Sequence, residues 1–403
     1  MARESFYKVR EKLLSYIKPL EKEECMLKEC LGRVLAQEVT AKMNVPPFSR
    51  SAYDGYALRA RDTEQASAEN PVSFKILEEL RAGEMPHDPV TKQEAVKLLT
   101  GAAIPPGADA VIKYEVTKYT KKQVTIYEPL KSGSNIIKEG EDIRQGRRLA
   151  GQGEVIDPGL VGTLASQNIG SVIVYRVPKI GILSTGKELL KVGAKAEPGK
   201  IYDSNQYSLS AAVINLGCSP VILGMAADDP KGIAQKLEQG LTCCDLLIVT
   251  GGVSAGDYDL TPKAMEMTGL QLLQKGVDLK PGMACAYGIK EGKMVCALSG
   301  NPAAAITNFH VLVSPVIRKL KGERTYLREE FSVRLLDSFP KNSPGTRILR
   351  GKLEISNCQA GIRIPKDQGN AVLSSTIGNN LYAIVEAGSG PLEEGSILKG
   401  FLI

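Results

Sequence analysis

Three short loops rich in glycine and small hydroxyl residues each follow an apolar run between residues 178 and 302. The loops are Ser184-Thr185-Gly186, Thr250-Gly251-Gly252-Val253-Ser254 and Ser299-Gly300-Asn301-Pro302. In an α/β sheet, ligands bind at the carboxyl ends of the strands, and loops without bulky side chains let backbone N–H groups reach an anion there. Three such loops in one candidate domain predict a site for a phosphate-bearing molecule.

Carboxylates stand beside these loops in the sequence. Glu188 follows the first loop, and Asp257 and Asp259 follow the second. A carboxylate next to an anion would repel it unless a cation lay between them, and Mg²⁺ prefers oxygen ligands. The pattern therefore predicts an anion site that uses Mg²⁺. Asp203 and Asp228 each precede a predicted helix, so a role as a helix cap stays open for both.

Several other kinds of chemistry lack the residues that they need. The chain has two histidines, His87 and His310, which argues against a histidine-rich zinc site and a histidine-centred hydrolase. It contains no G-x-x-x-x-G-K-[ST] phosphate loop and no G-x-G-x-x-G after a first strand, so neither a P-loop ATPase nor a Rossmann NAD site is expected. Catalysis would rest on carboxylates, hydroxyls, backbone amides and lysines such as Lys280, which lies on a proline–glycine turn.

The charge and hydropathy of the chain limit the classes of protein to which it can belong. A formal net charge of +6 over 403 residues permits an anionic small molecule, and no basic stripe with interleaved aromatics predicts nucleic-acid binding. The charged N-terminus lacks the apolar core of a signal peptide, and the apolar runs are too short to span a membrane. None of the eight cysteines forms C-x-x-C, which favours reduced core cysteines. We therefore expect a cytoplasmic protein that binds neither membranes nor nucleic acid.

The elements that must position the loops alternate between strands and helices. The predicted strands are Lys179–Leu183, Pro220–Met225, Asp245–Val249 and Met294–Leu298. The predicted helices are Gln206–Leu216, Lys231–Gly240, Thr261–Met267 and Ala303–Lys321. This alternation predicts βαβ units and a mainly parallel sheet.

The rest of the chain follows other patterns. Residues 3–18 and 31–37 read as helices, and a third helix begins at Asp157-Pro158-Gly159. Short strand candidates separated by Gly and Pro clusters make residues 70–130 a β-rich module. After Glu323 the helical signal ends and short strands continue to the C-terminus, which predicts a small β-barrel or sandwich. A chain of this length should form two to four domains.

Several motifs in a fixed order resemble those of one family. The segment Pro46–Ala57 resembles the P-P-F-x-x-S-x-x-D-G-Y-A segment of the molybdopterin molybdenumtransferases, the MoeA family that includes the gephyrin E domain. Further matching motifs follow the same order as in the family: Thr100-Gly101-Ala102 with Gly107–Val111, Gly140-Glu141-Asp142-Ile143, the Ser184 loop with Glu188, Gly199–Asn205, the Thr250 loop with Asp259, Lys280-Pro281-Gly282 and Gly300-Asn301-Pro302. The resemblance covers nearly the whole chain.

The resemblance implies an α/β and β multidomain fold. It implies a discontinuous linker domain at 1–44 and 137–176, a β-rich inserted domain at 45–136, a three-layer α/β molybdopterin-binding domain at 177–323 and a C-terminal β-barrel domain at 324–403. It further implies a homodimer, with the catalytic cleft between the α/β domain of one subunit and the β-rich domain of the other.

The implied activity belongs to molybdenum cofactor biosynthesis. It is the Mg²⁺-dependent insertion of molybdate into adenylylated molybdopterin (molybdopterin-AMP), with release of AMP, and the adenylyltransferase that makes this substrate is the implied partner. The resemblance implies catalytic roles for Asp54, Thr100, Asp142, Glu188 and Lys280, and metal binding by Glu188, Asp228 and Asp259. It implies cofactor binding by Ser184, Thr185, Gly186, Asp203, Ser204, Asn205, Thr250, Gly251, Gly252, Val253, Ser254, Gly300, Asn301 and Pro302.

The chain departs from the family pattern at a few positions. Lys187 stands where the family often has Asp or Asn, and Met283 stands where it often has Lys. These departures leave open a divergent paralogue that acts as a pterin- or nucleotide-binding scaffold. A related nucleotide enzyme is a further alternative, although the segments around Asp54 and Thr100 argue against it. The choice between molybdate and tungstate also stays open.

Overall fold

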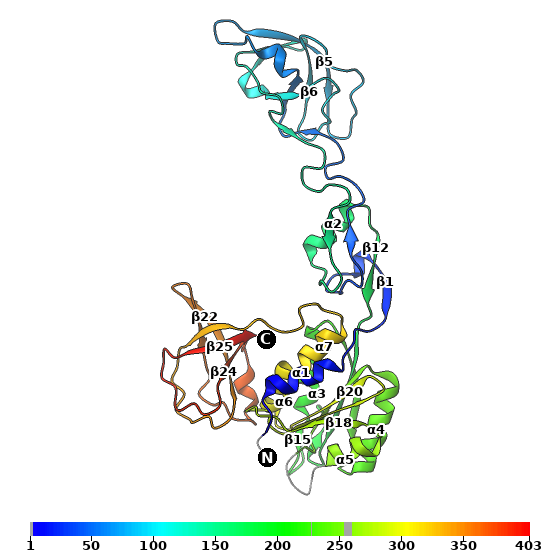
Figure 1. Cartoon of the computed structure of the whole chain (residues 1–403), viewed down its shortest axis with the longest axis vertical. Helices are drawn as coiled ribbons and strands as arrows, with labels where there is room; N and C mark the ends of the chain where they lie inside the picture. Colours follow the sequence, from blue (N-terminus) through cyan, green and yellow to red (C-terminus); the bar gives the residue numbers. More distant parts are fainter. Residues whose placement is uncertain (1–2, 227, 254–259) are drawn as a thin grey trace. The chain divides into compact units, whose positions relative to one another are not determined.

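The computed structural model describes residues 3–226, 228–253 and 260–403, and the chain divides into two compact units (Figure 1). The larger unit comprises Met1–Gln37, Gln152–Asp157 and Val172–Ile403, and the smaller unit comprises Glu38–Gly151 and Pro158–Ser171. The four domain boundaries expected from the sequence are finer than this division and stay predictions. No helix in the described ranges is long and apolar enough to cross a bilayer.

A six-stranded sheet forms the centre of the larger unit, with strand order β16-β13-β17-β20-β19-β18. The strands are β16 (Ser219–Ala226), β13 (Lys179–Thr185), β17 (Leu246–Thr250), β20 (Lys293–Leu298), β19 (Cys285–Lys290) and β18 (Gln271–Lys275). The first four are parallel, and β19 and β18 continue the sheet as antiparallel strands. The predicted mainly parallel α/β sheet is therefore confirmed.

Helices cover both faces of this sheet, which makes three layers. The helices are α3 (Ser204–Asn215), α4 (Pro230–Cys243), α5 (Leu260–Met267), α6 (Pro302–Asn308) and α7 (Ser314–Leu320). Alternate residues of β17 enter different cores: Leu246 and Ile248 pack with α3, α6 and α7, whereas Leu247 and Val249 pack with α4 and α5. This period of two is what a strand buried on both faces requires.

The last predicted helix of this domain forms as one run of three segments. A π-helical turn, Phe309–Val313, joins α6 to α7. Pro315 lies in the first turn of α7. Because proline has no N–H and its ring clashes with the preceding turn, it interrupts the regular ladder, and a π turn is a common way to absorb the interruption.

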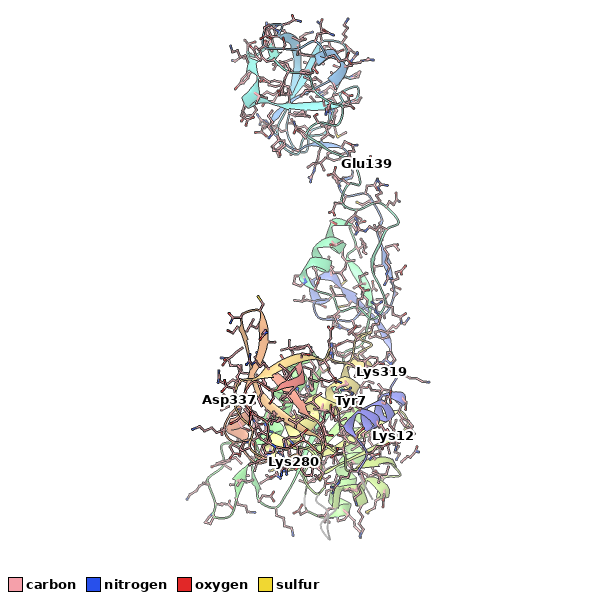
Figure 2. The ribbon with its side chains drawn as sticks, turned by 60° about the vertical axis from the view of Figure 1, so that its left-hand side comes forward. Tyr7, Lys12, Glu139, Lys280, Lys319 and Asp337 are labelled. Carbon is pink, nitrogen blue, oxygen red and sulfur yellow. The ribbon has the colours of Figure 1, made fainter. Side chains whose placement is uncertain are left out.

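The N-terminal helix α1 (Phe6–Ser15) packs on the same layer as α7. Its apolar stripe, which includes Phe6, Val9 and Leu13, is fully buried in that core. Polar contacts add to this packing (Figure 2): the Tyr7 hydroxyl donates to Glu330 Oε2 at 3.2 Å, and Lys319 Nζ donates to the Leu14 carbonyl at 2.9 Å. The predicted helix over 3–18 is confirmed with shorter ends.

The predicted second helix, over residues 31–37, is wrong. The chain there turns at residues 31–32 and then forms isolated bridges, from Val34 to Val155 and from Leu35 to Val174. Nearby, β1 (Lys22–Met26) pairs with β12 (Ser171–Tyr175). Pairing with segments far along the chain therefore overrides local helix preference in this region.

The C-terminal residues form a closed five-stranded barrel, which is one of the two predicted alternatives. Its strands are β21 (Phe331–Leu335), β23 (Gln359–Arg363), β22 (Arg347–Ser356), β24 (Leu381–Val385) and β25 (Ile397–Leu402). The barrel shares a core with the α/β layers, since Ile348, Tyr382 and Phe401 pack in the same cluster as Phe309. The barrel and the α/β sheet are thus parts of one packed body.

The smaller unit is built mainly of β-strands. Its six-stranded sheet has the order β7-β4-β6-β5-β9-β8. The strands are β7 (Ala110–Lys113), β4 (Gly55–Leu58), β6 (Glu94–Leu98), β5 (Val72–Leu80), β9 (Gln123–Ile126) and β8 (Lys118–Tyr119). Two short pairs, β3 (Arg50–Ser51) with β10 (Ile136–Ile137) and β2 (Val39–Thr40) with β11 (Arg148–Ala150), and helix α2 (Pro158–Ser166) complete the unit.

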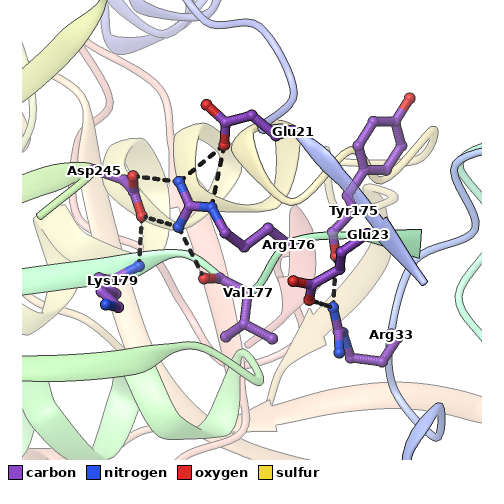
Figure 3. Close-up of polar contacts among 8 residues, drawn as sticks. All are labelled: Glu21, Glu23, Arg33, Tyr175, Arg176, Val177, Lys179 and Asp245. Carbon is purple, nitrogen blue, oxygen red and sulfur yellow. Dashed lines mark hydrogen bonds and ion pairs between the residues drawn. The ribbon is translucent and has the colours of Figure 1, made fainter. Parts of the chain in front are cut away.

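An arginine-centred cluster stabilises the point where the chain enters the α/β sheet (Figure 3). The Arg176 guanidinium donates to both oxygens of Asp245, at 2.8 and 2.9 Å, and to Glu21. The Lys179 N–H also donates to Asp245. Burial alone would raise the pKa of Asp245, but the hydrogen bonds from Arg176 and from the Lys179 N–H outweigh it and lower that pKa.

We expect Asp245→Asn to lower the free energy of unfolding at pH 7 by about 1–3 kcal/mol, because a partly buried charged pair loses one partner. The folded-state pKa of Asp245 is lowered, so its stabilisation is complete above about pH 4, the usual range of an unfolded aspartate, and is lost as the pH falls below it. The difference between variant and wild type should therefore shrink in acid. Urea unfolding followed by circular dichroism at several pH values measures it.

Asp337→Asn is the matched control, since Asp337 also pairs with an arginine, Arg363, but on the surface of the barrel. An exposed pair should contribute less than about 1 kcal/mol. Equal losses in the two variants would contradict a structural role for the Arg176 cluster.

Candidate functional site

The three glycine-rich loops lie side by side at one edge of the sheet. In the parallel register, Ser184 of β13 pairs with Thr250 of β17, and Thr250 pairs with Leu298 of β20, so the three strands end level. The loops that follow line one cavity of about 630 Å³. Its lining residues are Thr185, Gly186, Glu188, Leu189, Ile201, Tyr202, Asp203, Ser204, Asn205, Asp228, Thr250, Gly251, Gly252, Val253, Leu260, Ala284, Ser299, Gly300, Asn301, Pro302 and Ala371.

Glycine is required at two positions of the second loop. Gly251 and Gly252 have φ of +97° and +64°, in the region that favours glycine. A Cβ on Gly251 would lie 2.5 Å from the Thr185 carbonyl oxygen, and a Cβ on Gly252 would lie 2.5 Å from the Thr261 hydroxyl. The absence of side chains is thus what lets this loop pack against β13 and α5.

The hydroxyl groups of these loops mostly hold the strand ends together. The Thr185 hydroxyl donates to the Thr250 carbonyl at 3.2 Å, and the Thr250 hydroxyl donates to Ser184 Oγ at 3.4 Å. Thr261 in α5 donates its hydroxyl to the Gly251 carbonyl at 2.9 Å. Ser184 is fully buried and does not line the cavity, whereas Thr185 and Thr250 do.

Two of the three predicted metal ligands line the cavity. Glu188 turns back over Gly186, where a Cβ would come within 2.6 Å of the glutamate Oε1. Asp228 lies next to Asp229, which caps α4 by accepting from the Gly232 N–H, so Asp228 is not needed as that cap. Within the described ranges, no three acidic, histidine or cysteine side chains form a ready metal cluster. The third predicted ligand, Asp259, and the predicted Ser254 lie outside the described residues.

The first turn of α3 forms another wall of the cavity. Asp203 caps this helix, with its Oδ1 accepting from the Gln206 N–H at 3.0 Å, which confirms the capping role left open by the sequence. Asn205 Nδ2 donates to the Gly300 carbonyl at 2.8 Å and so ties the helix to the third loop. Both side chains are buried, with exposed fractions of 4% and 8%.

Lys280 lines a second cavity, of about 390 Å³, that adjoins the first. The two cavities share Val253, Ala284, Ser299 and Asn301. Arg3 and Lys275 line this second cavity together with Lys280, which Figure 2 labels. The lining therefore carries a concentration of positive charge beside the larger cavity.

The barrel fixes the segment that carries Lys280. The Lys280 N–H donates to the Thr346 carbonyl at 2.9 Å, and the Ile348 N–H donates to the Lys280 carbonyl at 2.8 Å. Two residues earlier, Asp278 accepts from both the N–H and the hydroxyl of Thr346. The N-terminal segment adds a further bond, from the Asp278 N–H to the Glu4 carbonyl. The backbone at Lys280 is thus held from two sides.

A buried arginine supports the barrel loop that reaches the second cavity. Arg350 is fully buried, and burial lowers its pKa. Its Nη2 donates to the Gly369 carbonyl and to Ser375, while Nε and Nη1 have no partner among the described residues. Asn370 follows Gly369, lines the second cavity, and accepts from the Ala304 N–H of α6.

In the smaller unit, Asp54 and Thr100 form a pair although they are distant in sequence. They come together because Gly55 of β4 pairs with Leu98 of β6. The Thr100 hydroxyl and N–H each donate to Asp54 Oδ1 at 2.6 Å, and these bonds lower the pKa of Asp54. Gly55 is needed because a Cβ there would lie 2.0 Å from the Ile112 carbonyl oxygen. Asp142 is exposed on a separate loop, where its N–H donates to the Val45 carbonyl.

Sequence reasoning did not identify Arg3 and Lys275 as lining residues. Neither lies in a motif, and they reach the cavity only through the packing of the N-terminus and β18. Asn370 lies in the segment Gln368-Gly369-Asn370, which matches a family motif only loosely, and it was not predicted as a site residue. Tyr202 lies within the Gly199–Asn205 motif and Leu189 directly follows Glu188, but neither was predicted as a site residue.

Comparison with known proteins gives consistent matches over nearly the whole chain. Residues 4–168 match the family described as "MoeA N-terminal region (domain I and II)", and residues 181–319 match the family described as "Probable molybdopterin binding domain". The chain is 35% identical over 390 residues to a molybdopterin molybdenumtransferase of Bacillus subtilis, covering 95% of this chain and 90% of that protein. It is 34% identical over 338 residues to a molybdopterin molybdenumtransferase of Staphylococcus epidermidis, covering 84% of this chain and 80% of that protein.

Solved structures agree with the sequence comparison. A molybdopterin biosynthesis moeA protein of Pyrococcus horikoshii superposes with a TM-score of 0.85 and 30% identity, covering 100% of both chains. A molybdenum cofactor biosynthesis protein of Pyrococcus furiosus shares the fold, with a TM-score of 0.60 and 20% identity over 100% of both chains.

We expect Gly251→Ala to destabilise the protein and to disturb the cavity, because the new Cβ meets the Thr185 backbone as well as an unfavourable φ. Gly193→Ala is the matched control, since Gly193 has a φ of +89° but nothing within 4 Å of its Cβ. The control should lose about 1–2 kcal/mol for its backbone conformation alone. Gly251→Ala should lose about 1–3 kcal/mol more, measured by urea unfolding. Equal losses would show that close approach at Gly251 carries no cost.

Proposed function

Because the chain belongs to the MoeA family of molybdopterin molybdenumtransferases, enzymes of molybdenum cofactor biosynthesis, we propose that it inserts molybdate into molybdopterin-AMP with the help of Mg²⁺ and releases AMP. The observation that carries this proposal is the pair of adjoining cavities. One is lined by glycine loops and carboxylates, and the other by three cationic side chains. The two anionic substrates, molybdate and molybdopterin-AMP, would each have a suitable surface there.

The glycine loops suit the phosphates of the adenylylated substrate. Loops at the carboxyl ends of β13, β17 and β20 place backbone at the cavity wall without side chains in the way. α6 begins at Pro302, directly after Asn301, so a helix N-terminus with its partial positive charge lies at this wall. We assign the phosphoanhydride to this region.

The carboxylates fit Mg²⁺. Magnesium is commonly held by one or two carboxylates together with substrate phosphates and water, and Glu188 and Asp228 supply two carboxylates in the same cavity. When bound, the ion would neutralise phosphate charge and stabilise the AMP leaving group. Asp259 is the third proposed ligand.

The second cavity suits molybdate. Arg3, Lys275 and Lys280 line it, and the fixed backbone at Lys280 costs little reorganisation when an oxyanion binds. The buried guanidinium of Arg350, whose Nη2 donates to the Gly369 carbonyl, adds positive charge next to Asn370 of this lining. We propose that these groups bring molybdate next to the molybdopterin end of the substrate.

The pair Asp54–Thr100 and the exposed Asp142 would complete the site from a second subunit of a homodimer. Asp54 accepts two hydrogen bonds that hold its carboxylate in one orientation, as expected of a group that orients a ligand or its water. A molybdopterin adenylyltransferase would supply the substrate, and we propose it as a partner in the cytoplasm.

We expect Glu188→Gln to reduce AMP release at limiting Mg²⁺ by about 100-fold, because an amide is a weaker magnesium ligand than a carboxylate, and higher Mg²⁺ should restore part of the rate. The assay mixes purified protein, molybdopterin-AMP, molybdate and Mg²⁺, and measures AMP. Glu197→Gln, an exposed glutamate between β14 (Leu189–Leu190) and β15 (Ile201–Tyr202), is the control and should be unaffected. No AMP release by the wild type at any molybdate concentration would refute the proposed function.

Mixing inactive variants tests the two-subunit site. Suppose that each site takes Glu188 from one subunit and Asp54 from the other. A mixed dimer, with one Asp54→Asn subunit and one Glu188→Gln subunit, then contains one intact site and one site that lacks both residues. Half of the dimers in an equal mixture are mixed, so AMP release should recover to about a quarter of the wild-type rate. No recovery, although mass spectrometry shows mixed dimers, would contradict a shared site.

A further inference from the structure

Two hydrogen-bond acceptors at the start of α3 have no donor among the described residues. Asp203 Oδ2 and Asn205 Oδ1 are buried atoms without a hydrogen-bond partner among the described residues. The two side chains are 96% and 92% buried and line the larger cavity. Buried polar atoms in native proteins are nearly always paired, so each unpaired one calls for a partner that binds there.

The orientation of both side chains is fixed by their other bonds. Asp203 Oδ1 is occupied by the Gln206 N–H, which leaves Oδ2 as the unpaired oxygen. Asn205 must place its Nδ2 toward the Gly300 carbonyl, because only the nitrogen can donate, and Oδ1 is therefore the atom left without a partner. The two unpartnered atoms are therefore both acceptors. The bond to the Gly300 carbonyl also excludes a flip of the Asn205 amide.

Such a wall selects a ligand group that carries N–H donors. Phosphate and molybdate oxygens are acceptors at neutral pH, and the Asp203 carboxylate would repel them. The same cavity is lined by Leu189 and by Tyr202, whose hydroxyl donates to the Ala194 carbonyl at 3.0 Å. A flat heterocycle with donors on one edge fits an aromatic and aliphatic surface that ends in two acceptors.

We propose that the first turn of α3 is the subsite for the aminopyrimidinone edge of the pterin, with Asp203 and Asn205 as the residues that recognise it. This edge carries two adjacent donors, the ring N3–H and the 2-amino group, which match two acceptors. Adenine, the other ring in molybdopterin-AMP, has its 6-amino group flanked by ring nitrogens that are acceptors, so one of its lone pairs would face a protein oxygen. The inference rests on the proposed function, because it takes a pterin as the substrate.

Binding of two small probes tests this subsite without any turnover. The probes are 6-hydroxymethylpterin and 6-hydroxymethyllumazine, in which a 2-oxo group replaces the 2-amino group. Ligand-observed NMR at millimolar probe concentration gives their relative affinities. Wild-type protein should prefer the pterin by about 10- to 100-fold, because a hydrogen bond to a charged acceptor is replaced by two facing acceptors.

Asp203→Asn should abolish this preference. Asparagine caps a helix as well as aspartate does, so α3 should keep its fold, and its Oδ1 can still accept from Gln206. The second position becomes an NH₂ group, which suits the 2-oxo probe and not the 2-amino probe. The lumazine should then bind at least as tightly as the pterin. Circular dichroism and the thermal midpoint check that the variant is folded.

Asp229→Asn is the matched control. Asp229 also caps a helix, with its Oδ1 accepting from the Gly232 N–H at 2.8 Å, but it does not line the cavity. Its variant should keep the wild-type preference for the pterin.

The outcomes separate this inference from the proposed function. A wild-type protein that binds neither probe, that shows no preference, or whose preference survives Asp203→Asn would overturn the subsite, whatever the AMP assay gives. A preference that depends on Asp203 in a protein that releases no AMP would keep the subsite and refute the reaction. Asp229→Asn losing the preference as well would also overturn the assignment.

Discussion

The level ending of three adjacent parallel strands is the constraint on which the rest of the site depends. Ser184, Thr250 and Leu298 lie in register across β13, β17 and β20, and this register brings the three glycine-rich loops of the larger cavity together. It is held by two cores, since alternate residues of β17 enter opposite layers. A slip of one residue would exchange these layers and would move all three loops out of line, so burial on both faces protects the geometry of the site.

The second cavity depends on a different kind of support, which joins segments far apart in the chain. Lys280 gains its position from the barrel through Thr346 and Ile348, and Asp278 connects the same segment to the N-terminus. The barrel can do this because it shares a core with the α/β layers. The backbone that carries Lys280 beside the larger cavity is therefore held in place, which matters for a site that must bring two anions together without reorganisation.

The sequence predicted the parts of this protein that have a local cause. The strand and helix periods of the α/β sheet, the loops after β13, β17 and β20, and the capping role of Asp203 could all be read from short patterns. Parts with a non-local cause could not. Residues 31–37 were predicted as a helix but form none, because Val34 and Leu35 bridge to Val155 and Val174. Arg3 and Lys275 reach the second cavity through packing alone. The pairing of Asp54 with Thr100 needed the structure, because it follows from a strand pair that Gly55 permits.

The polarity of the larger cavity changes from one wall to the next, and this change restricts how a ligand can lie. The glycine loops and the N-terminus of α6 present a surface for negative charge, and the second cavity beside them is cationic. At the start of α3, Asp203 Oδ2 and Asn205 Oδ1 are acceptors without a donor among the described residues. A ligand with an anionic part and a donor-bearing ring can satisfy both walls in one orientation, whereas the reversed orientation would place phosphate against a carboxylate. Unpaired acceptors and repelled anions both cost free energy. The orientation of the ligand is therefore set mainly by the cost of the reversed orientation.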